Sequence, residues 1–597
     1  MVSRRVALAL CATVLLGTIL GLPLAASLGA GSPSSELDGP GATADRSQPS
    51  PSELPTAEAD EAGDTRCPQP IDATETDADP RIVELYPNPT AHGNVGEYLV
   101  IETPPETQFE NWSLTDGHTT ARLPNETASG RIALTTDPDE TRELIDDPVV
   151  ELDGTVRLAA DGDELELRNE DRTLDAVAYD RAPTAERWYR TTGTGDVEST
   201  DDVPGSGEWW PRGATCLPAS TVDTDKATAF VLPDSPDVPR ETIHEADDRL
   251  LLAGYTFTDD DVADDLVAAA DRGVDVAVLL ESGPVGGTPA ATADVLETLE
   301  RGGVDVRVVG GEGARYRFHH PKYAVADGSV LVTSENWKPS GVGGESSRGW
   351  GVRLEDDTLA NELAAVFRAD FEGWDTGSGA SFREDTSFVE DDSPPPREFP
   401  AAHGAETVSV DEAELLLAPE NAEPRLLELL ADADDEILIK QANIADDVSL
   451  LEATLEAARR GVDVRLLLDS TWYVEDEHEA LAADLEHVAE EEELSLEVEL
   501  VEDTDAFEKI HAKGIVIDRE VAVVGSANWN ENSLRNNREV LLALHGAEAA
   551  AYYAEVFESD WDGDESWSLP FELSLAVIVA LAAAAAVGHR YVRFGSE

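Results

Sequence analysis

The chain carries one spaced group of polar residues twice, and this duplication limits the possible folds more than any other feature. The spacing H-x-K-x4-D occurs at two places that lie 191 residues apart. Its members are His320, Lys322 and Asp327 in the first copy and His511, Lys513 and Asp518 in the second. An apolar run follows each copy and ends in a serine and an asparagine, which are Ser334 and Asn336, then Ser526 and Asn528. The near-constant offset indicates a duplicated domain.

The similarity between the two halves continues outside the motif. The segment RGVDV at 272–276 recurs at 460–464, each time after a helix-like stretch and before an apolar run. Alternating helix-like and strand-like segments favour a layered α/β domain. We therefore expect a first repeat at 226–375, an acidic linker at 376–403 and a second repeat at 404–563.

The first residues of the chain have the layout of a targeting segment. Residues 1–31 combine Arg4 and Arg5 with a long apolar run and small residues, which predicts an export signal of partly twin-arginine type. An uncleaved membrane anchor is the alternative. Residues 32–79 are rich in Ser, Pro and acidic residues without apolar periodicity, and they predict a disordered acidic spacer.

A different pattern fills residues 80–181, where short alternating apolar runs are separated by Pro, Asn, Gly and Asp. This pattern predicts a β-sandwich. The segments IVELYPNP at 82–89, GEYLVIE at 96–102 and NWSLTDG at 111–117 resemble the lamin-tail domain, an immunoglobulin-like sandwich. The resemblance implies a non-catalytic binding or spacer module. A connector rich in Pro, Gly, Trp and Asp is expected at 182–225.

The chain has 3 cysteines, and two of them flank the predicted sandwich. Cys11 would leave with a cleaved signal, so Cys67 and Cys216 remain. An oxidising exterior favours a disulfide between them, and two free thiols are the alternative. No Cys/His spacing indicates a metal site, and we expect no cofactor.

An apolar, Ala-rich run near the end of the chain predicts a transmembrane helix at 569–588, with a buried helix of a soluble domain as the alternative. Arg590 and Arg593 favour a cytoplasmic tail at 589–597. Together with the export signal, this run predicts a protein anchored to the cell membrane with the two repeats facing outside.

Acidic residues greatly outnumber basic ones, since 42 Lys and Arg stand against 124 Asp and Glu for a net charge of −82. The charge is spread along the whole chain, which resembles the proteome-wide acidity of extreme halophiles. Such a chain repels nucleic acid and anionic lipid at low salt, but at about 1 M salt the screening length is only about 3 Å. Charge alone therefore excludes neither substrate, and recognition must come from close contacts in a site.

The paired motifs, each followed by a serine and an asparagine, resemble the phospholipase D superfamily over about 230–563. The resemblance implies a pseudo-two-fold axis between the repeats and one site that holds both histidines. It also implies a ping-pong reaction through a phosphohistidine, with hydrolysis when water is the acceptor and transfer when an alcohol is. By analogy with the family, His320 is expected to be the nucleophile and His511 the acid and base.

The residue types suit phosphodiester cleavage, which needs a nucleophile, a proton donor and positive charge around phosphorus. Lys322 and Lys513 are expected to neutralise the phosphoryl oxygens. Asp327 and Asp518 are expected to support the motif strands. The remaining polar residues are expected to bind phosphate or to support the histidines, and they are Ser334, Asn336, Ser526, Asn528 and Glu539.

The two copies differ in their acidic residues. Glu539 resembles the family carboxylate that orients a histidine ring, which would make the second copy the better ordered half. The corresponding run of the first copy, 347–350, reads SRGW and has no carboxylate, so Glu345 is a candidate replacement. Arg315 and Arg317 are expected either to contact substrate phosphate or to form a solvated edge.

These features favour a metal-independent phosphodiesterase of the phospholipase D type. Phospholipid is the expected substrate because the predicted anchor holds the site near a bilayer. An extracellular nuclease is the alternative, since lamin-tail-like domains accompany exported nucleases. A third interpretation is a surface binding protein without turnover. No obligate protein partner is evident.

Overall fold

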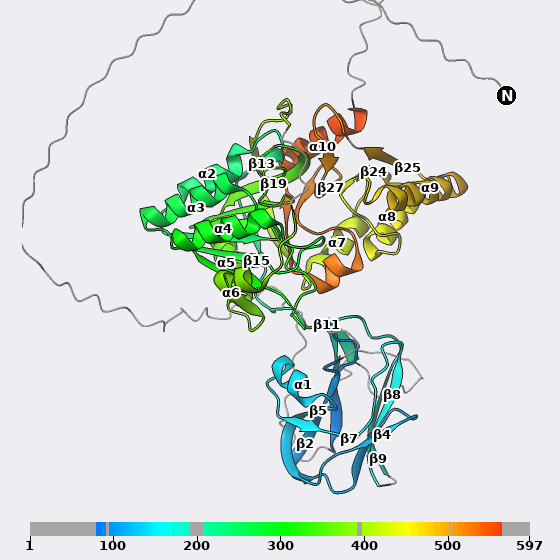
Figure 1. Ribbon diagram of the computed structural model, residues 1–597. Coiled ribbons are helices and arrows are strands. Elements are labelled where there is room, and N and C mark those ends of the chain that lie inside the picture. Colours follow the sequence, from blue (N-terminus) through cyan, green and yellow to red (C-terminus); the bar gives the residue numbers. More distant parts are fainter. Residues whose placement is uncertain are drawn as a thin grey trace, which may run out of the picture. The chain divides into compact units, whose positions relative to one another are not determined.

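Figure 1 shows the computed structural model of the chain, which describes residues 79–90, 95–170, 172–191, 207–311, 313–390, 397–501 and 503–563. Several predicted features lie outside these residues. They are the export signal at 1–31, the spacer at 32–79 apart from its last residue, Cys67, the transmembrane helix at 569–588 and the tail at 589–597. Among the described residues, no helix is long and apolar enough to cross a membrane.

Two β-sheets form the N-terminal part of the described chain. One sheet contains β1 (Arg81–Tyr86), β2 (Tyr98–Gln108), β5 (Thr127–Thr135), β6 (Val149–Glu151), β10 (Glu186–Arg190) and β11 (Gly207–Pro211). The other contains β3 (Trp112–Thr115), β4 (Thr120–Arg122), β7 (Asp153–Gly154), β8 (Asp163–Asn169) and β9 (Arg172–Tyr179), and α1 spans Pro138–Leu144. Buried residues of both sheets share one core, for example Ile101 of β2 and Leu167 of β8. The residues thus form a two-layer sandwich, and its likeness to the lamin-tail domain stays a prediction.

The segments expected to connect domains contribute strands to them. Within 182–225, β10 and β11 extend the sandwich, and β12 (Thr221–Asp223) pairs with a strand of the second repeat. Within 376–403, β20 (Thr376–Ser378) pairs with the first repeat and is followed by α6 (Gly379–Asp385). The high Pro, Gly and acidic content of these segments predicted linkers there, without short strands or a helix. Cys216 forms a disulfide, and its predicted partner Cys67 lies outside the described residues.

The first repeat is a mixed sheet with helices on both faces. Its strands are β13 (Lys226–Leu232), β14 (Arg249–Gly254), β15 (Asp275–Glu281), β16 (Asp305–Val309), β17 (Tyr323–Ala326), β18 (Ser329–Thr333) and β19 (Ser347–Glu355). Its helices are α2 (Asp237–Glu245), α3 (Asp260–Arg272), α4 (Ala290–Arg301) and α5 (Asp357–Phe371). The RGVDV segment has a clear structural cause here, because Gly273 ends α3 with φ of 98° and the chain then enters β15.

The second repeat has the same plan. Its strands are β22 (Glu412–Ala418), β23 (Glu436–Gln441), β24 (Asp463–Asp469), β25 (Leu496–Val501), β26 (Lys509–Ile510), β27 (Lys513–Ile517), β28 (Val521–Gly525) and β29 (Glu539–His545). Its helices are α7 (Ala422–Ala431), α8 (Ser449–Arg460), α9 (Glu475–Glu492) and α10 (Ala547–Asp562), with a π-helical turn at Asn532–Asn536. Gly461 ends α8 with φ of 103°, as Gly273 ends α3.

Strand order shows that the two repeats are copies. The second sheet runs β22-β29-β28-β27-β23-β24-β25, and the first runs β13-β19-β18-β17-β14-β15-β16. The repeats also exchange short strands, because β12 pairs with β22 and β21 (Glu406–Ser409) pairs with β13. The duplicated α/β architecture that the sequence predicted is therefore confirmed.

The largest core lies between the two sheets and is shared by both repeats. It contains residues of both motif hairpins, such as Val332 and Val524, and of the two last helices, such as Phe367 of α5 and Tyr553 of α10. Helices α2 to α4 cover the outer face of the first sheet, and α7 to α9 cover that of the second (Figure 1). Burial of this shared face makes the two repeats one folding unit and places their motif strands together.

Candidate active site

The motif histidines lie where the two repeats interlock. His320 stands before β17 and His511 before β27. The backbone N–H of His320 donates to the carbonyl oxygen of Arg538 at 3.0 Å, and that of His511 donates to the carbonyl oxygen of Arg348 at 2.9 Å. Arg538 belongs to the second repeat and Arg348 to the first, so each histidine segment is held by the opposite repeat.

Glu539 positions the histidine of the other copy. Both of its carboxylate oxygens lie 2.9 Å from Nδ1 of His320. The carboxylate also accepts hydrogen bonds from Ser526 Oγ at 2.5 Å and from Asn537 Nδ2 at 3.0 Å. Because Glu539 is an acceptor, it favours the tautomer of His320 with hydrogen on Nδ1 and a lone pair on Nε2. The expectation that Glu539 makes the second copy the better ordered half is wrong, since it serves the first.

Glu335 is the matching carboxylate, and the sequence did not single it out. Its Oε2 lies 3.2 Å from Nδ1 of His511, at ion-pair distance without an aligned hydrogen bond. Ser347 Oγ donates to the same oxygen at 3.2 Å. The available signal was the contrast between TSEN at 333–336 and GSAN at 525–528, where a glutamate stands in place of Ala527.

In the first copy, the carboxylate stands at a different position, at the end of the neighbouring strand of the sheet. Strand pairing aligns Thr333 with Gly351 and Gly525 with Leu541, so Gly349 occupies the position of Glu539. A Cβ atom at Gly349 would lie only 2.2 Å from Cγ of Glu335, so the glutamate side chain fills that space. The candidate replacement Glu345 is not the carboxylate at His511, because Glu335 holds that place.

Both imidazoles have depressed pKa values. Burial, together with the charges of Lys322 and Lys513, lowers the pKa of His320 to about 4, although Glu539 opposes the change. Burial and the charge of Lys513 lower the pKa of His511 to about 3, against the opposing effect of Glu335. Both rings are therefore neutral near pH 7 before an anion binds. The side chains of His320 and His511 keep 11% and 17% of their surface exposed, so they reach solvent while their carboxylates are buried.

The motif lysines provide the positive charge of the site. Lys513 Nζ donates to the carbonyl oxygen of His511 at 2.7 Å, and Lys322 Nζ donates to that of His320. Burial lowers the pKa of Lys513 to about 8 and holds the pKa of Lys322 well below its usual range. The charge of Lys513 lowers the pKa of Lys322, and the carboxylates of Glu335 and Glu539 raise the pKa of both lysines. The four groups therefore form one electrostatic unit.

The motif serines support strands. Ser334 Oγ accepts the backbone N–H of Trp350 at 3.0 Å, and Ser526 Oγ accepts that of Val540 at 3.1 Å. Neither hydroxyl is bonded to a histidine ring in the described structure. Ser526 instead acts on His320 through Glu539.

The motif asparagines keep unused hydrogen-bonding capacity. Oδ1 of Asn336 and Oδ1 of Asn528 are buried and have no partner in the part of the chain that the structure describes. Buried polar groups are nearly always paired. The unpaired atoms are acceptors, so the side-chain groups of these asparagines that can donate to a phosphoryl oxygen are their Nδ2 groups.

Asp327 and Asp518 lie at the far ends of the motif strands. Asp327 accepts the backbone N–H groups of residues 247–249 at 2.8 to 3.0 Å, and Asp518 accepts those of residues 434–436 at 2.7 to 2.9 Å. Burial alone would raise the pKa of Asp327, but these backbone bonds lower it below its usual value. The two aspartates therefore hold the backbone at the entry to β14 and β23.

Neighbours of the first motif have structural partners. Arg315 Nε donates to Asp375 at 2.9 Å, so its guanidinium is engaged within the fold. His319 is buried, with Nε2 at 3.5 Å from Asp370. Arg317 is exposed, which agrees with a solvated edge.

Comparison with known proteins identifies the repeats. A family model described as "Cardiolipin synthase, PLD-like domain" matches residues 240–371 and again residues 426–561. Each repeat therefore matches the phospholipase D-like domain. The two matches contain the two H-x-K-x4-D motifs, so the resemblance read from the motifs is confirmed at this level.

Proteins similar to this chain match only part of it. Cardiolipin synthase B of Escherichia coli K12 is 26% identical over 336 residues, which cover 51% of this chain and 72% of that protein. Mitochondrial cardiolipin hydrolase of Mus musculus is 34% identical over 53 residues, 9% of this chain and 24% of that protein. Among solved structures, phosphatidylserine synthase of Haemophilus influenzae has a TM-score of 0.43 at 13% identity, over 57% of this chain and 87% of that one. Nuc of Salmonella typhimurium has a TM-score of 0.23 at 19% identity, over 27% and 98%.

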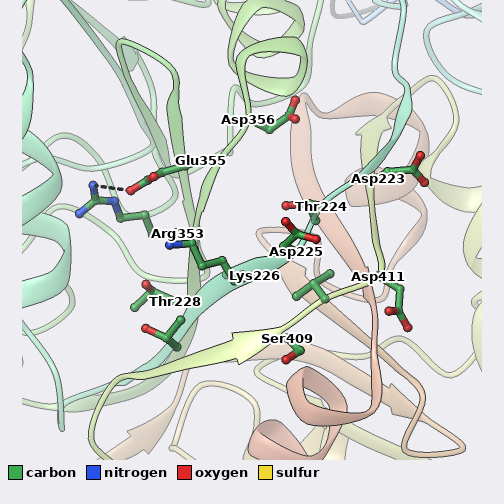
Figure 2. Close-up of a pocket in the computed structure, with 13 residues that line it drawn as sticks. Asp223, Thr224, Asp225, Lys226, Thr228, Arg353, Glu355, Asp356, Ser409 and Asp411 are labelled. Carbon is green, nitrogen blue, oxygen red and sulfur yellow. Dashed lines mark ion pairs between the residues drawn. The ribbon is translucent and has the colours of Figure 1, made fainter.

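A cavity of about 750 Å³ lies away from the histidines of the phospholipase D-like repeats. Figure 2 shows its lining of mostly polar and charged side chains around the start of β13, and Arg353 and Glu355 form an ion pair of 3.7 Å there. The opposite end of β13, at Leu232, pairs with Gly349 beside Glu335. None of the H-x-K-x4-D residues lines this cavity. No group of three or more His, Cys, Asp or Glu suited to a metal ion occurs among the described residues.

Proposed function

We propose that the chain is a phosphodiesterase of the phospholipase D type that acts on phospholipid through a phosphohistidine. The observation that carries the proposal is the crossed pairing of His320 with Glu539 and of His511 with Glu335. Each pair joins the two repeats, and the motif lysines stand beside both. Two oriented imidazoles in a positive environment are the groups that a two-step displacement at phosphorus requires.

In the first step, Nε2 of His320 attacks phosphorus. The P–O bond to the leaving alcohol breaks as the N–P bond forms, and the alcohol oxygen takes a proton from Nε2 of His511. Lys322 and Lys513 neutralise charge on the non-bridging oxygens, and Asn336 and Asn528 donate to the same oxygens. His320 is the better nucleophile because its Nδ1 is aligned with Glu539, whereas His511 has a looser contact with Glu335.

The proton on His511 depends on the substrate. The lysine charges that lower the pKa of the ring are offset when a phosphodiester brings its negative charge to the site. Binding therefore raises the pKa of the facing imidazole and allows it to act as an acid. In the second step His511 accepts a proton from water, the hydroxide oxygen attacks phosphorus, and the N–P bond breaks to release a phosphomonoester and neutral His320. An acceptor alcohol in place of water gives transfer.

Phospholipid is favoured over nucleic acid as substrate. One relative, matched over 51% of this chain, is named as a cardiolipin synthase, and another as a cardiolipin hydrolase.

The proposal is tested with the purified full chain in detergent micelles, at about 1 M salt and with EDTA present. We expect cleavage of bis(4-nitrophenyl) phosphate and of micellar phospholipid, and loss of both activities in His320→Ala and in His511→Ala. Turnover retained in either variant contradicts the mechanism. Single- and double-stranded DNA are assayed in parallel, and cleavage of DNA without cleavage of lipid assigns the nuclease function. No turnover of any substrate favours the binding interpretation.

We also propose that the repeats act outside the cell from a membrane anchor. The support is the apolar runs at 1–31 and 569–588, both outside the described residues. Protease added to intact cells should degrade the repeats. Protection of the repeats until the cells are lysed would contradict this location.

A further inference from the structure

Exposed apolar side chains are concentrated beside the histidines. Among the described residues, the large hydrophobic side chains that are exposed are Val95, Val285, Trp374, Val389, Trp472 and Tyr473. Val285 is 79% exposed and lies in the loop after β15, and Trp472 is 85% exposed and lies in the loop after β24. Tyr473 adjoins Trp472, and Val389 exchanges backbone hydrogen bonds with Thr288 and Ala290 at 2.9 and 2.8 Å. Four of the six therefore belong to two equivalent places in the repeats.

These two loops are connected to the two histidines. The backbone N–H of Val285 donates to Tyr255 Oη at 2.6 Å, and the Tyr255 ring packs edge-on against His320 with centroids 4.6 Å apart. On the other side, Lys509 Nζ lies 5.9 Å from the centroid of the Tyr473 ring, and its charge acts on His511.

The strands that precede the loops make the same contact in both repeats. Glu281, at the end of β15, accepts the backbone N–H before His320 at 2.7 Å. Asp469, at the end of β24, accepts the backbone N–H before His511 at 2.9 Å. The loops at 282–289 and 470–474 thus start from the residues that anchor the histidine segments, and we call their exposed side chains the apolar rim.

The loops themselves carry no charge. Neither 282–289 nor 470–474 contains Asp, Glu, Lys or Arg, although 28% of the chain's residues are charged. A surface that binds nucleic acid presents Lys and Arg to phosphates, and these loops present none. Paired Trp and Tyr side chains with aliphatic neighbours are the side chains that settle at a membrane interface.

We propose that the apolar rim docks on a phospholipid surface, with Val285 on one side of the histidines and Trp472 on the other. This inference rests on the proposed function and adds the way in which substrate is reached. A lipid surface that touches both loops presents its headgroup phosphates between them, toward His320 and His511. Acidic residues 475–477 follow the second loop, so the docking is apolar and strengthens as salt screens their repulsion from anionic lipid.

The test uses the full chain in mixed micelles of a non-ionic detergent and phosphatidylglycerol. Turnover of the lipid is divided by turnover of bis(4-nitrophenyl) phosphate for each protein. We expect this ratio to fall at least about tenfold in Val285→Ser/Trp472→Ser, with a higher interfacial KM. Trp472→Phe should recover most of the ratio. Trp374→Ser, which removes an exposed tryptophan from outside the rim, should leave the ratio unchanged.

Fluorescence tests docking without turnover. The emission of Trp472 is the difference between wild type and Trp472→Phe, and brominated phospholipid in the micelle should quench it. The difference obtained with Trp374→Phe should not be quenched. An unquenched Trp472 together with an unchanged activity ratio overturns the proposal. Quenching of Trp472 by a single-stranded oligonucleotide and not by lipid also overturns it. If the protein turns over no lipid while lipid still quenches Trp472, the proposed function fails and the docking proposal stands.

Discussion

At the residue scale, each motif histidine is paired with a carboxylate from the opposite repeat. The two carboxylates occupy different positions in their strand pairs. Position 539 supplies the carboxylate to His320, and position 335 supplies it to His511 because position 349 is glycine. In both arrangements, one carboxylate lies next to the Nδ1 atom of the histidine. The chemistry is therefore preserved although the sequence of the two copies differs.

Removal of Glu335 should impair the acid and base. We expect Glu335→Ala to lower kcat by about 10²- to 10⁴-fold, because His511 loses the charge that orients its ring. Glu345→Ala is the matched control and should behave like wild type. Gly349→Glu alone should be disruptive, since its Cβ would overlap Glu335, and Glu335→Ala/Gly349→Glu should recover activity. A double variant no better than Glu335→Ala would contradict the relocation of the carboxylate.

The alkaline limit of activity should follow Lys513. Its pKa is lowered to about 8 and its charged form is the useful one, so kcat/KM should fall as pH rises through about 8. In Lys513→Arg the charge persists, because a guanidinium stays protonated, and the fall near pH 8 should disappear even if the maximum rate is lower. Rate measurements from about pH 6 to 10 check this. A fall in kcat/KM near pH 8 in both wild type and Lys513→Arg would assign that fall to another group.

Sequence reasoning found residues whose spacing repeats and missed those defined by packing. The two H-x-K-x4-D sets and Glu539 are visible as patterns. Glu335 is not, because its role depends on the absence of a side chain at Gly349 on the adjacent strand and on a histidine from the other repeat. Which histidine each carboxylate contacts likewise depends on how the two repeats pack together, and no local sequence pattern gives that packing.

At the scale of elements, buried ion pairs tie the last helix of each repeat to the other repeat. Arg348 of β19 lies 2.9 Å from Asp560 of α10, and Arg538 before β29 lies 3.0 Å from Asp370 of α5. Arg348 and Arg538 also pair with Asp234 and with Glu420. These contacts occur at equivalent places in the two repeats, and Arg348 and Arg538 also supply the backbone carbonyls that hold the histidine segments.

Loss of one such arginine should destabilise both repeats together. Arg348→Met leaves Asp234 without its ion-pair partner and leaves Asp560 with Lys440 alone, so the free energy of unfolding should fall by about 3–5 kcal/mol. Arg519→Met removes an exposed pair with Glu436 and should change it by less than about 1 kcal/mol. Urea unfolding measures both. Separate transitions for the two repeats, or equal effects of the two substitutions, would contradict the shared core.

The same scale explains which elements the sequence could predict. Helix ends were readable where a glycine adopts positive φ, as at Gly273 and Gly461. Strands β10, β12 and β20 were not, because they are short and owe their conformation to pairing with β1, β22 and β16. Strand pairing with distant partners leaves little trace in a local pattern.

At the scale of the whole molecule, net charge should control stability. A chain of −82 repels itself when folded compactly, and salt screens that repulsion. We expect Tm to rise by at least about 5 °C between about 0.1 M and 2 M KCl, measured by calorimetry. NaCl at equal ionic strength should give the same rise, because screening does not depend on the ion. A Tm that is independent of salt would show that repulsion is balanced within the fold.

The central claim is that one site, built by both repeats, works through a phosphohistidine on His320. The most direct test is a rapid-mixing assay of His511→Ala with bis(4-nitrophenyl) phosphate, whose leaving group needs no acid. The account predicts a burst of about one nitrophenolate per protein and a phosphoryl adduct on His320, because the first step proceeds and the second lacks its base. His320→Ala should give neither burst nor adduct. A burst in His320→Ala, or an adduct on any other residue, would contradict the account.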